Sequence, residues 1–541
     1  MPKAVLIGLD GATFTILDPL MERGVMPFLR HFAQRGVRAK LRSVIPALTP
    51  PAWTSLMTGK RPGQHGVFDF FQRDSVDSDF VRLADSRDIG SATIWSLASD
   101  HGKRVIALNF PVTFPAPAVD GCIVPGGWMP WRQLRLGCHP PGLFDRLRAL
   151  PSFSPRELAL DMALEEKAIE GCASEEYADW VSLHTRREQR WLDILRYLMQ
   201  TEPADLIGIM FDGVDKLHHL CWRFIDPAFQ VARPSAWEQQ ISQLCERYFR
   251  QLDAAIAEIV DLAGPGATVV LASDHGGGPA SDVFFVNAWL EQQGFLAWVA
   301  DTAPTRKSGG SADQSPRLGM GQIARHVYEL DWERTVAYAA TPSSLGIHIV
   351  DRSLGGANGA GSESYRQIQR RLIDGLRALR HPVTGRPVVE AVHTRDEVFA
   401  GPFESLAPDL TLSLADGGAV SILRSDTLLS RRREVAGNHR PEGIFLASGP
   451  GIRRGASLPD LSIVDVAPLL LYSAEVPVPD DMTGRFPDEV FEPAALHERP
   501  VRTATGQGTL PRDGAGVPEP HLEADDEAAV MARLRALGYV D

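Results

Sequence analysis

The chain has few cysteines and no long apolar run. Its five cysteines, in 541 residues, include no CxxC pair. An odd, sparse set of this kind predicts reduced thiols rather than a disulfide framework. The first apolar run, residues 4–9, is too short for the core of a signal peptide, and no stretch reaches the roughly 18 apolar residues of a membrane span. These absences predict a cytoplasmic protein without a membrane span.

Basic residues and nucleotide-binding signatures are also scarce. Lys and Arg number 55 against 68 Asp and Glu, which gives a net charge of −13. Sequence-independent binding to nucleic acid is therefore not expected. The absence of GxGxxG and P-loop patterns argues against a dinucleotide or NTPase site. An anionic substrate stays compatible with the charge if metal ions create a local positive site.

Short apolar segments alternate with stretches of helical spacing. Residues 4–9 and 206–211 are continuous apolar runs, which are typical of central parallel strands. Helical spacing covers residues 14–35, which end at Gly36, and helices are predicted at about 165–199 and 237–263. This alternation predicts an α/β fold with a largely parallel sheet.

Changes in composition divide the chain. Two stretches, about 128–203 and 301–430, interrupt the strand–helix rhythm and are predicted to be insertions beside the sheet. Residues 493–523 are rich in Pro, Gly and charge, which predicts a linker or disordered tail. Residues 524–541 have the pattern of a short amphipathic helix.

One hydroxyl stands out because of the residues that follow it. In residues 43–66 (SVIPALTPPAWTSLMTGKRPGQHG), Thr49 precedes a Pro-Pro pair and an apolar helical stretch. Pro is favoured in the first turn of a helix, so Thr49 is expected where backbone N–H groups and the helix dipole attract an anion such as a phosphate ester. This position favours Thr49 over the other hydroxyls of the stretch, which are Ser43, Thr54, Ser55 and Thr58.

Candidate metal ligands follow three predicted strands and precede a fourth. They are Asp10, Asp215, His219, Asp274, His275 and His439. Asp215 and His219 stand at i and i+4, which puts both on one face of a helix. Strand ends on one side of an open α/β sheet form its binding crevice, so these side chains are expected to converge. A metal there would lower the pKa of the Thr49 hydroxyl.

Structural roles compete with several of these assignments. Asp10 would also suit a turn, and His439 a surface loop. Asp212 and His218 stay open as alternatives to Asp215 and His219. The three glycines at 276–278 are expected to permit close approach to a ligand. Two further residues are predicted to be structural rather than ligating: His65 in a turn, and Cys221 as a buried thiol.

The ordered set of motifs resembles the alkaline phosphatase superfamily and, within it, the type I phosphodiesterase/nucleotide pyrophosphatase family. The carriers are GLDGAT around Asp10, the stretch from Thr49 to Gly66, DKLHH from Asp215, SDHG at 273–276 and GNHRPEG around His439. The resemblance covers roughly residues 3–490. It implies an alkaline phosphatase-like catalytic domain at 1–490, with a three-layer, doubly wound α/β sandwich and a mostly parallel central sheet.

The resemblance also implies two divalent metals and a covalent intermediate. One metal would be held by Asp215, His219 and His439, and the other by Asp10, Thr49, Asp274 and His275. Mixed Asp/His ligands favour zinc, with manganese as the alternative. Thr49 would form a phosphothreonine in a phosphodiesterase or nucleotide pyrophosphatase acting on a small phosphorylated substrate. A phosphomonoesterase or phosphotransferase on the same scaffold, and a non-catalytic binding protein, are the alternatives.

Overall fold

The apolar runs assemble into one central sheet, seen in a computed structural model that describes residues 1–73, 81–126, 133–158, 172–299, 329–350 and 363–510. The sheet has nine strands in the order β17-β2-β16-β8-β1-β7-β5-β6, with β18 also paired to β2. β16 runs antiparallel to β2 and β8, and the other pairs are parallel. The strands are β1 (Ala4–Leu9), β2 (Val37–Arg42), β5 (Val105–Leu108), β6 (Gly121–Val124), β7 (Leu206–Phe211), β8 (Thr268–Ala272), β16 (Glu442–Ser448), β17 (Ala456–Ser457) and β18 (Leu461–Ser462).

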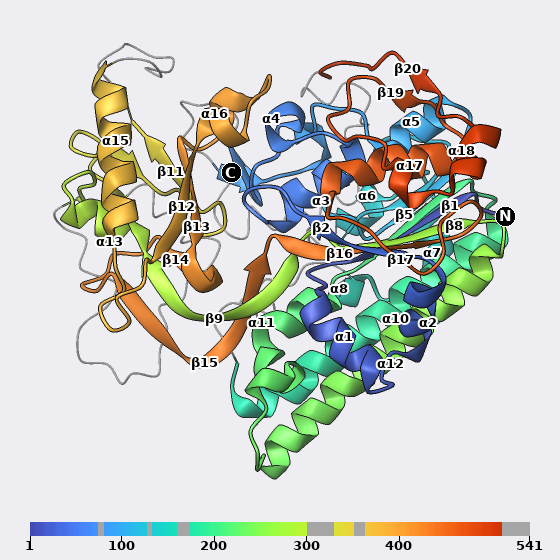
Figure 1. Cartoon of the computed structure of the whole chain (residues 1–541), viewed down its shortest axis with the longest axis horizontal. Coiled ribbons are helices and arrows are strands. Elements are labelled where there is room, and N and C mark those ends of the chain that lie inside the picture. Colours follow the sequence, from blue (N-terminus) through green and yellow to red (C-terminus); the bar gives the residue numbers. More distant parts are fainter. Residues whose placement is uncertain (74–80, 127–132, 159–171, 300–328, 351–362, 511–541) are drawn as a thin grey trace, which may run out of the picture.

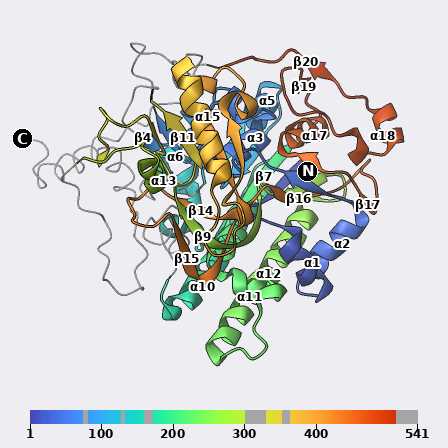
Figure 2. The ribbon, with the colours of Figure 1, turned by 60° about the vertical axis from the view of Figure 1, so that its left-hand side comes forward.

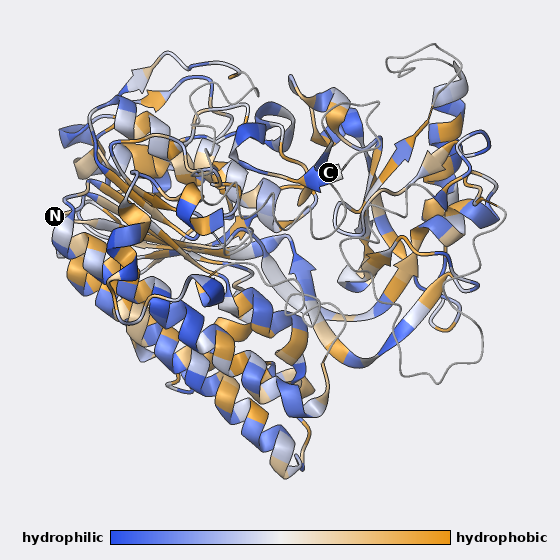
Figure 3. Ribbon diagram, turned by 180° about the vertical axis from the view of Figure 1, so that it is seen from behind, coloured by the Kyte–Doolittle hydropathy of each residue, from blue (hydrophilic) through white to orange (hydrophobic). Residues whose placement is uncertain are grey.

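Helices cover both faces of this sheet (Figure 1). Successive side chains of a strand point to opposite faces, so Val5, Ile7 and Leu9 enter one core and Ala4 and Leu6 the other. Figure 3 shows the sheet largely in the colour of hydrophobic residues between these layers. The first layer holds α1 (Phe14–Glu22), α2 (Pro27–Arg35), α6 (Leu134–Gly137), α7 (Leu143–Arg148), α8 (Pro155–Leu158), α10 (Tyr177–Thr201), α11 (Gly213–Ile225) and α12 (Ala236–Ala263), and the second holds α3 (Thr49–Thr58), α5 (Ile94–Asp100) and α17 (Val466–Ser473). This three-layer α/β fold confirms the predicted fold class.

Two predicted helices differ in their limits. Residues 14–35 form two helices rather than one continuous pattern, because the chain turns at Gly24 with φ +73°, a conformation that glycine adopts readily. In the described part, α10 begins at Tyr177 instead of near residue 165. Residues 159–171, which include the predicted start, lie outside the described residues.

A second body, which we call the cap (described residues within 276–440), lies beside the sheet. Two long curved strands, β9 (Gly276–Phe285) and β15 (Leu429–Arg440), run side by side from the sheet into it (Figures 1 and 2). The predicted insertion therefore begins at β9 and not near residue 301, because β9 continues directly from Asp274 and His275. The other cap elements are α13 (Val286–Gln292), β10 (Ala337–Tyr338), β11 (Gly346–Ile349), α15 (Glu363–Ala378), β12 (Val389–Thr394), α16 (Arg395–Val398), β13 (Leu410–Leu414) and β14 (Ala419–Ser421).

The chain after residue 493 is folded as far as residue 510, so the predicted linker is wrong for this part. It forms α18 (Pro493–Glu498) and β20 (Thr503–Ala504), which pairs with β19 (Val478–Pro479). Leu496, Val501 and Leu510 pack against the second core. These apolar contacts hold a segment whose overall composition is typical of a linker. Residues 511–541, with the predicted helix at 524–541, lie outside the described residues.

Smaller elements complete the description. A short hairpin joins β3 (Phe71–Arg73) and β4 (Val81–Leu83), and α4 (Pro62–His65) follows α3. Among the described residues, no helix is long and apolar enough to cross a bilayer.

Candidate metal centre

The predicted ligands meet at the carboxyl ends of three neighbouring strands. Asp10 follows β1, Asp215 lies in the first turn of α11 after β7, and Asp274 follows β8. They belong to two groups in which the potential ligand atoms of each group lie within 4.8 Å of one another. The first group is Asp215, His219 and His439, and the second is Asp10, Asp274 and His275.

The first group joins one face of α11 to the end of β15. His219 Nε2 lies 3.3 Å from Asp215 Oδ1 and 3.1 Å from His439 Nε2. His439 Nε2 is 3.5 Å from the same carboxylate oxygen. His439 lies in the strand and not in a surface loop. The i, i+4 spacing therefore places Asp215 and His219 together as predicted, and the fold adds His439 from far along the chain.

The second group meets the hydroxyl of Thr49 through His275. His275 Nε2 lies 3.4 Å from Asp10 Oδ1, 3.3 Å from Asp274 Oδ2 and 3.3 Å from Thr49 Oγ1. Thr49 is only 2% exposed, and Asp274 and His275 are fully buried. The rings of His275 and His439 stack with centroids 3.8 Å apart, so the two groups are adjacent.

Backbone carbonyls fix the orientation of all three imidazoles. His219 Nδ1 donates to Gly437 O at 3.1 Å, His275 Nδ1 to Gly276 O at 2.9 Å, and His439 Nδ1 to Ala47 O at 3.0 Å. A carbonyl can only accept, so the proton lies on each Nδ1 and each Nε2 turns a lone pair into the groups. Carbonyls orient metal-binding histidines in this way. Sequence patterns do not reveal these acceptors, because every residue carries a backbone carbonyl.

The buried carboxylates of the second group favour the binding of a cation. Burial raises the pKa of Asp10 well above its usual value, and the charges of Asp274 and Asp215 raise it further. Burial likewise raises the pKa of Asp274 to about 7. Asp10 Oδ1 and Asp274 Oδ2 are buried without a hydrogen-bond partner. Buried carboxylates are costly unless they are paired or bind a metal, so this set of oxygen and imidazole donors fits a divalent cation.

Asp215 behaves differently because two histidines face it. Burial alone would raise the pKa of its carboxyl, but His219 and His439 outweigh burial and hold that pKa well below its usual value. Burial lowers the pKa of His439 to about 4, which keeps its ring neutral and able to ligate.

Comparison with known proteins identifies the family. The model of type I phosphodiesterases and nucleotide pyrophosphatases matches residues 4–441. This chain belongs to that family. The match confirms the resemblance and makes the chain a phosphodiesterase- or pyrophosphatase-type hydrolase of the alkaline phosphatase superfamily, within a metal-dependent family. No curated protein matches the sequence.

Solved structures of ectonucleotide pyrophosphatase/phosphodiesterase 5 show the same fold at low sequence identity. Human ectonucleotide pyrophosphatase/phosphodiesterase 5 is 14% identical, covers 90% of this chain and 99% of its own, and superimposes with a TM-score of 0.50. An inactive form of the murine protein, in complex with AMP, is 13% identical over 91% of this chain and 100% of its own, also with a TM-score of 0.50. Phosphonoacetate hydrolase from Sinorhizobium meliloti is 18% identical over 88% and 95%, with a TM-score of 0.48.

The other hydroxyls of α3 make hydrogen bonds away from the two groups. Thr54 Oγ1 donates to Pro50 O and Thr58 Oγ1 to Thr54 O, each at 2.7 Å. Ser55 Oγ lies 2.8 Å from His65 Nε2. His65 Nδ1 also accepts from Val67 N–H at 3.2 Å, which is the local structural role predicted for it. Of the α3 hydroxyls, Thr49 is the one in contact with a candidate ligand.

The start of α3 offers fewer donors than its sequence predicts. Thr49 is the first residue of the helix. Pro50 and Pro51 carry no N–H, and the N–H of Ala52 donates to Leu48 O at 3.0 Å. The prolines that mark the helix start therefore remove donors from it. An anion at Thr49 would meet the helix dipole rather than a cluster of backbone N–H groups.

The alternative ligands lie outside both groups. His218 is buried against Trp222, with ring centroids 5.1 Å apart, and burial lowers its pKa to about 3. Asp212 Oδ2 lies 3.6 Å from the Arg187 guanidinium. Cys221 is a fully buried free thiol beside Cys245. These positions agree with structural roles.

The glycines after His275 allow close approach of other parts of the chain, and their approach to a ligand stays a prediction. A Cβ atom at Gly276 would lie 2.0 Å from Glu442 O, and one at Gly277 would lie 2.6 Å from His218 Nδ1. A Cβ at Gly278 would lie 2.7 Å from the Arg440 side chain. The glycines allow β9 to approach β16, α11 and β15.

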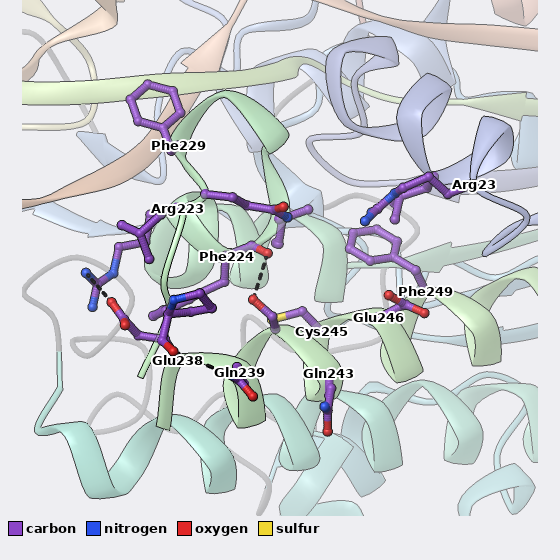
Figure 4. A pocket seen from close by; sticks show the side chains of 16 residues that line it. Arg23, Arg223, Phe224, Phe229, Glu238, Gln239, Gln243, Cys245, Glu246 and Phe249 are labelled. Atoms are coloured by element: carbon purple, nitrogen blue, oxygen red, sulfur yellow. Dashed lines mark hydrogen bonds and ion pairs between the residues drawn. The ribbon is translucent and has the colours of Figure 1, made fainter. Parts of the chain in front are cut away.

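A cavity of about 300 Å³ lies apart from the two groups (Figure 4). Arg223 and Phe224, at the end of α11 away from Asp215, line it together with Phe249 of α12. Arg223 is paired with Glu238 and Glu434. None of the candidate ligands lines this cavity.

Proposed function

We propose that the chain is a phosphodiesterase or nucleotide pyrophosphatase that acts through a phosphothreonine on Thr49. The observation that carries this proposal is the Thr49 hydroxyl, buried at the start of α3 and 3.3 Å from His275 beside the buried carboxylates Asp10 and Asp274. A hydroxyl is a weak nucleophile until its proton is removed or its pKa is lowered. The surrounding carboxylate and imidazole donors support a bound divalent cation as the activator.

Two ions are part of this proposal. Asp215, His219 and His439 would hold one, and Asp10, Thr49, Asp274 and His275 the other. The mixture of carboxylate and imidazole donors favours zinc, and manganese is the alternative. When bound, the ions would lower the pKa of the Thr49 hydroxyl and offset the charge of the phosphoryl oxygens.

The residues of the chain determine the course of the reaction. Thr49 Oγ1 gives up its proton and forms a bond to phosphorus while the bond from phosphorus to the leaving oxygen breaks. The leaving group takes up a proton on that oxygen and departs, and the phosphoryl group remains on Thr49 as the phosphothreonine. Water then attacks the phosphothreonine, and Thr49 Oγ1 recovers a proton as the P–O bond to it breaks. Burial of Thr49 keeps bulk water from competing with the substrate in the first step.

The proposal is tested with bis-p-nitrophenyl phosphate and p-nitrophenyl phosphate in the presence of zinc or manganese. We expect diester hydrolysis by the wild type, a loss of at least about a thousandfold in Thr49→Ala, and partial activity in Thr49→Ser. Thr54→Ser, on the same helix, is the matched control and should retain activity. Mass spectrometry after acid quenching should find the phosphoryl group on Thr49.

Other outcomes would contradict the proposal in different ways. Hydrolysis of the monoester alone would indicate a phosphatase or phosphotransferase. Metal-loaded protein that is silent on both esters and on nucleotide diesters would indicate a binding protein. Nucleotide diesters belong in the assay because a structural neighbour is an ectonucleotide pyrophosphatase solved with AMP.

A further inference from the structure

The two neighbours of His439 on β15 both contact the same turn of the cap. Along a strand, alternate side chains point to opposite faces, so Asn438 and Arg440 share the face opposite to His439. His439 points to the metal centre. Asn438 and Arg440 reach the turn formed by Ala415–Gly417 and Gly418, which connects β13 to β14.

Hydrogen bonds to backbone carbonyls make up this contact. Asn438 Nδ2 donates to Gly417 O at 2.9 Å and to Gly418 O at 3.2 Å. The Arg440 guanidinium donates to Asp416 O at 2.6 Å, to Pro279 O of β9, and to His439 O at 3.0 Å. The planar guanidinium of Arg440 thus contacts the turn, β9 and the backbone of His439 at once, and its rigid geometry fixes their relative positions.

The turn is shaped to receive the guanidinium. Asp416 and Gly417 have φ values of 53° and 58°, two consecutive left-handed residues. A Cβ atom at Gly417 would lie 1.4 Å from Arg440 Nη1. Only glycine leaves room for Arg440 at this position.

We propose that Asn438 and Arg440 are positioning residues that hold the His439 imidazole in the metal centre, so that the cap turn sets the geometry of one metal site. His439 Nδ1 already donates to Ala47 O at 3.0 Å on the sheet side. The ring is thereby oriented from the core, while its backbone is fixed from the cap. This inference rests on the proposed metal centre, and it explains why GNHR carries two polar residues beside the candidate ligand.

Zinc binding to the full-length, chelator-stripped protein tests the inference without reference to activity. In equilibrium dialysis we expect two ions in the wild type, and in Arg440→Gln a loss of about 10–100-fold in affinity for one of them. Asn438→Ala should weaken the same ion. Arg440→Lys, which keeps a donor, should lose less affinity. His439→Ala sets the upper limit, and adding Arg440→Gln to it should cause no further loss.

Two control variants separate positioning from general loosening of the cap. Arg395→Gln removes an ion pair within the cap, where Arg395 Nη2 lies 2.6 Å from Asp409 Oδ1. It should lower Tm and leave zinc affinity unchanged. Arg431→Gln, at an exposed position of β15, should change neither.

The two proposals fail in distinguishable ways. Wild-type affinity for both ions in Arg440→Gln, or equal losses in Arg395→Gln, would overturn the positioning role and leave the metal centre intact. A wild-type protein that binds no zinc or manganese would overturn the metal centre itself and the positioning role with it.

Discussion

The carboxylates of Asp10 and Asp274 are buried close together, and each has an oxygen without a hydrogen-bond partner. Burial raises both pKa values; the charges of Asp274 and Asp215 raise that of Asp10 further, and the charge of Asp215 raises that of Asp274, so the metal-free site opposes folding when it is ionised. Asp10→Asn should therefore stabilise the metal-free protein by roughly 1–3 kcal/mol at pH 8. The same variant should gain less stability from zinc than the wild type does, because it has lost a ligand. Urea unfolding with chelator and with zinc measures both effects.

Asp253→Asn is the matched control for this prediction. The Asp253 carboxylate accepts from the backbone N–H groups of Phe28 and Leu29 at 2.9 and 2.8 Å. Its loss should destabilise the protein equally with and without zinc. A metal-free Asp10→Asn that is less stable than the wild type would show that the buried carboxylates do not repel as inferred.

Glu188 predicts a pH dependence away from the metal centre. Burial raises its pKa to about 8, although Tyr248 OH and Gly213 N–H donate to Oε1 at 2.6 and 3.0 Å. The folded state therefore binds a proton that the unfolded state releases near its ordinary pKa of 4.5. Stability from this group is complete below pH 4.5 and is lost as pH rises to about 8. Unfolding free energies of the chelated protein should fall by about 2–4 kcal/mol over that range.

Glu188→Gln should reduce the slope of this pH dependence and leave the part due to Asp10 and Asp274, since the amide keeps an acceptor for Tyr248 and does not titrate. The half-buried Glu246, paired with Arg250 at 2.6 Å, provides the control Glu246→Gln, which should leave the slope unchanged. An equal slope in wild type and Glu188→Gln would contradict the prediction.

At the residue scale, the sequence predicts the candidate metal ligands better than it predicts the groups that orient them. The Asp and His residues that end or precede apolar strands are the ones that the fold gathers, because the carboxyl ends of neighbouring parallel strands meet. Their role as metal ligands stays a prediction. The partners of His219, His275 and His439 are backbone carbonyls, and the contact of Arg440 with Gly417 spans two distant segments. Neither kind of contact leaves a recognisable pattern in the local sequence.

Among the elements, α3 packs closely on β1 because Gly8 leaves room for one of its side chains. A Cβ atom at Gly8 would lie 2.5 Å from the ring of Trp53, in the helix that begins with Thr49. Gly8→Ala should lower the unfolding free energy by about 1–3 kcal/mol and displace α3. Activity should fall more than stability alone explains, because Thr49 moves with the helix.

Gly208→Ala is the matched control, on the neighbouring strand β7. Its Cβ would lie 2.3 Å from the ring of Trp95, which belongs to α5 and not to α3. Similar loss of stability with preserved kcat is expected there. Equal losses of kcat in Gly8→Ala and Gly208→Ala, measured at a temperature where both are folded, would contradict this role of Gly8.

Elements with strong local patterns are the ones that the sequence predicts. Fully apolar runs such as β1 and β7 are buried on both faces, and α12 begins and ends within a residue of its predicted limits. The start of the cap at β9 is not predicted, since Gly276–Phe285 is rich in glycine and lacks a continuous apolar run. Its partners β15 and β14 are both more than a hundred residues away, and pairing with them makes it a strand.

At the scale of the whole molecule, the cap is fastened to the core at more than one place. Besides β9 and β15, Thr341 and Ser343 of the cap donate to Asp69 of the core at 2.5 and 2.6 Å. The rings of Phe68 and Phe399 also meet edge to face across this boundary, with centroids 5.2 Å apart. A cap held at both ends can keep the turn at Gly417 in a fixed place relative to the sheet, which the positioning of His439 requires.

The chain after β19 packs against the second core, on the opposite side of the molecule from the cap (Figure 1). Leu496, Val501 and Leu510 cover the second core, and Lys60 Nζ binds both Asp481, at 2.7 Å, and Gly508 O. A chain ending at residue 492 should lose roughly 2–4 kcal/mol of unfolding free energy relative to one ending at residue 510. Lys60 follows the helix that carries Thr49, so the activity of the chain ending at residue 492 should also fall. Thermal unfolding of the full chain and of both truncated forms shows which truncation lowers the stability. Equal Tm values for the chains ending at 510 and 492 would show that residues 493–510 are the linker that their composition suggests.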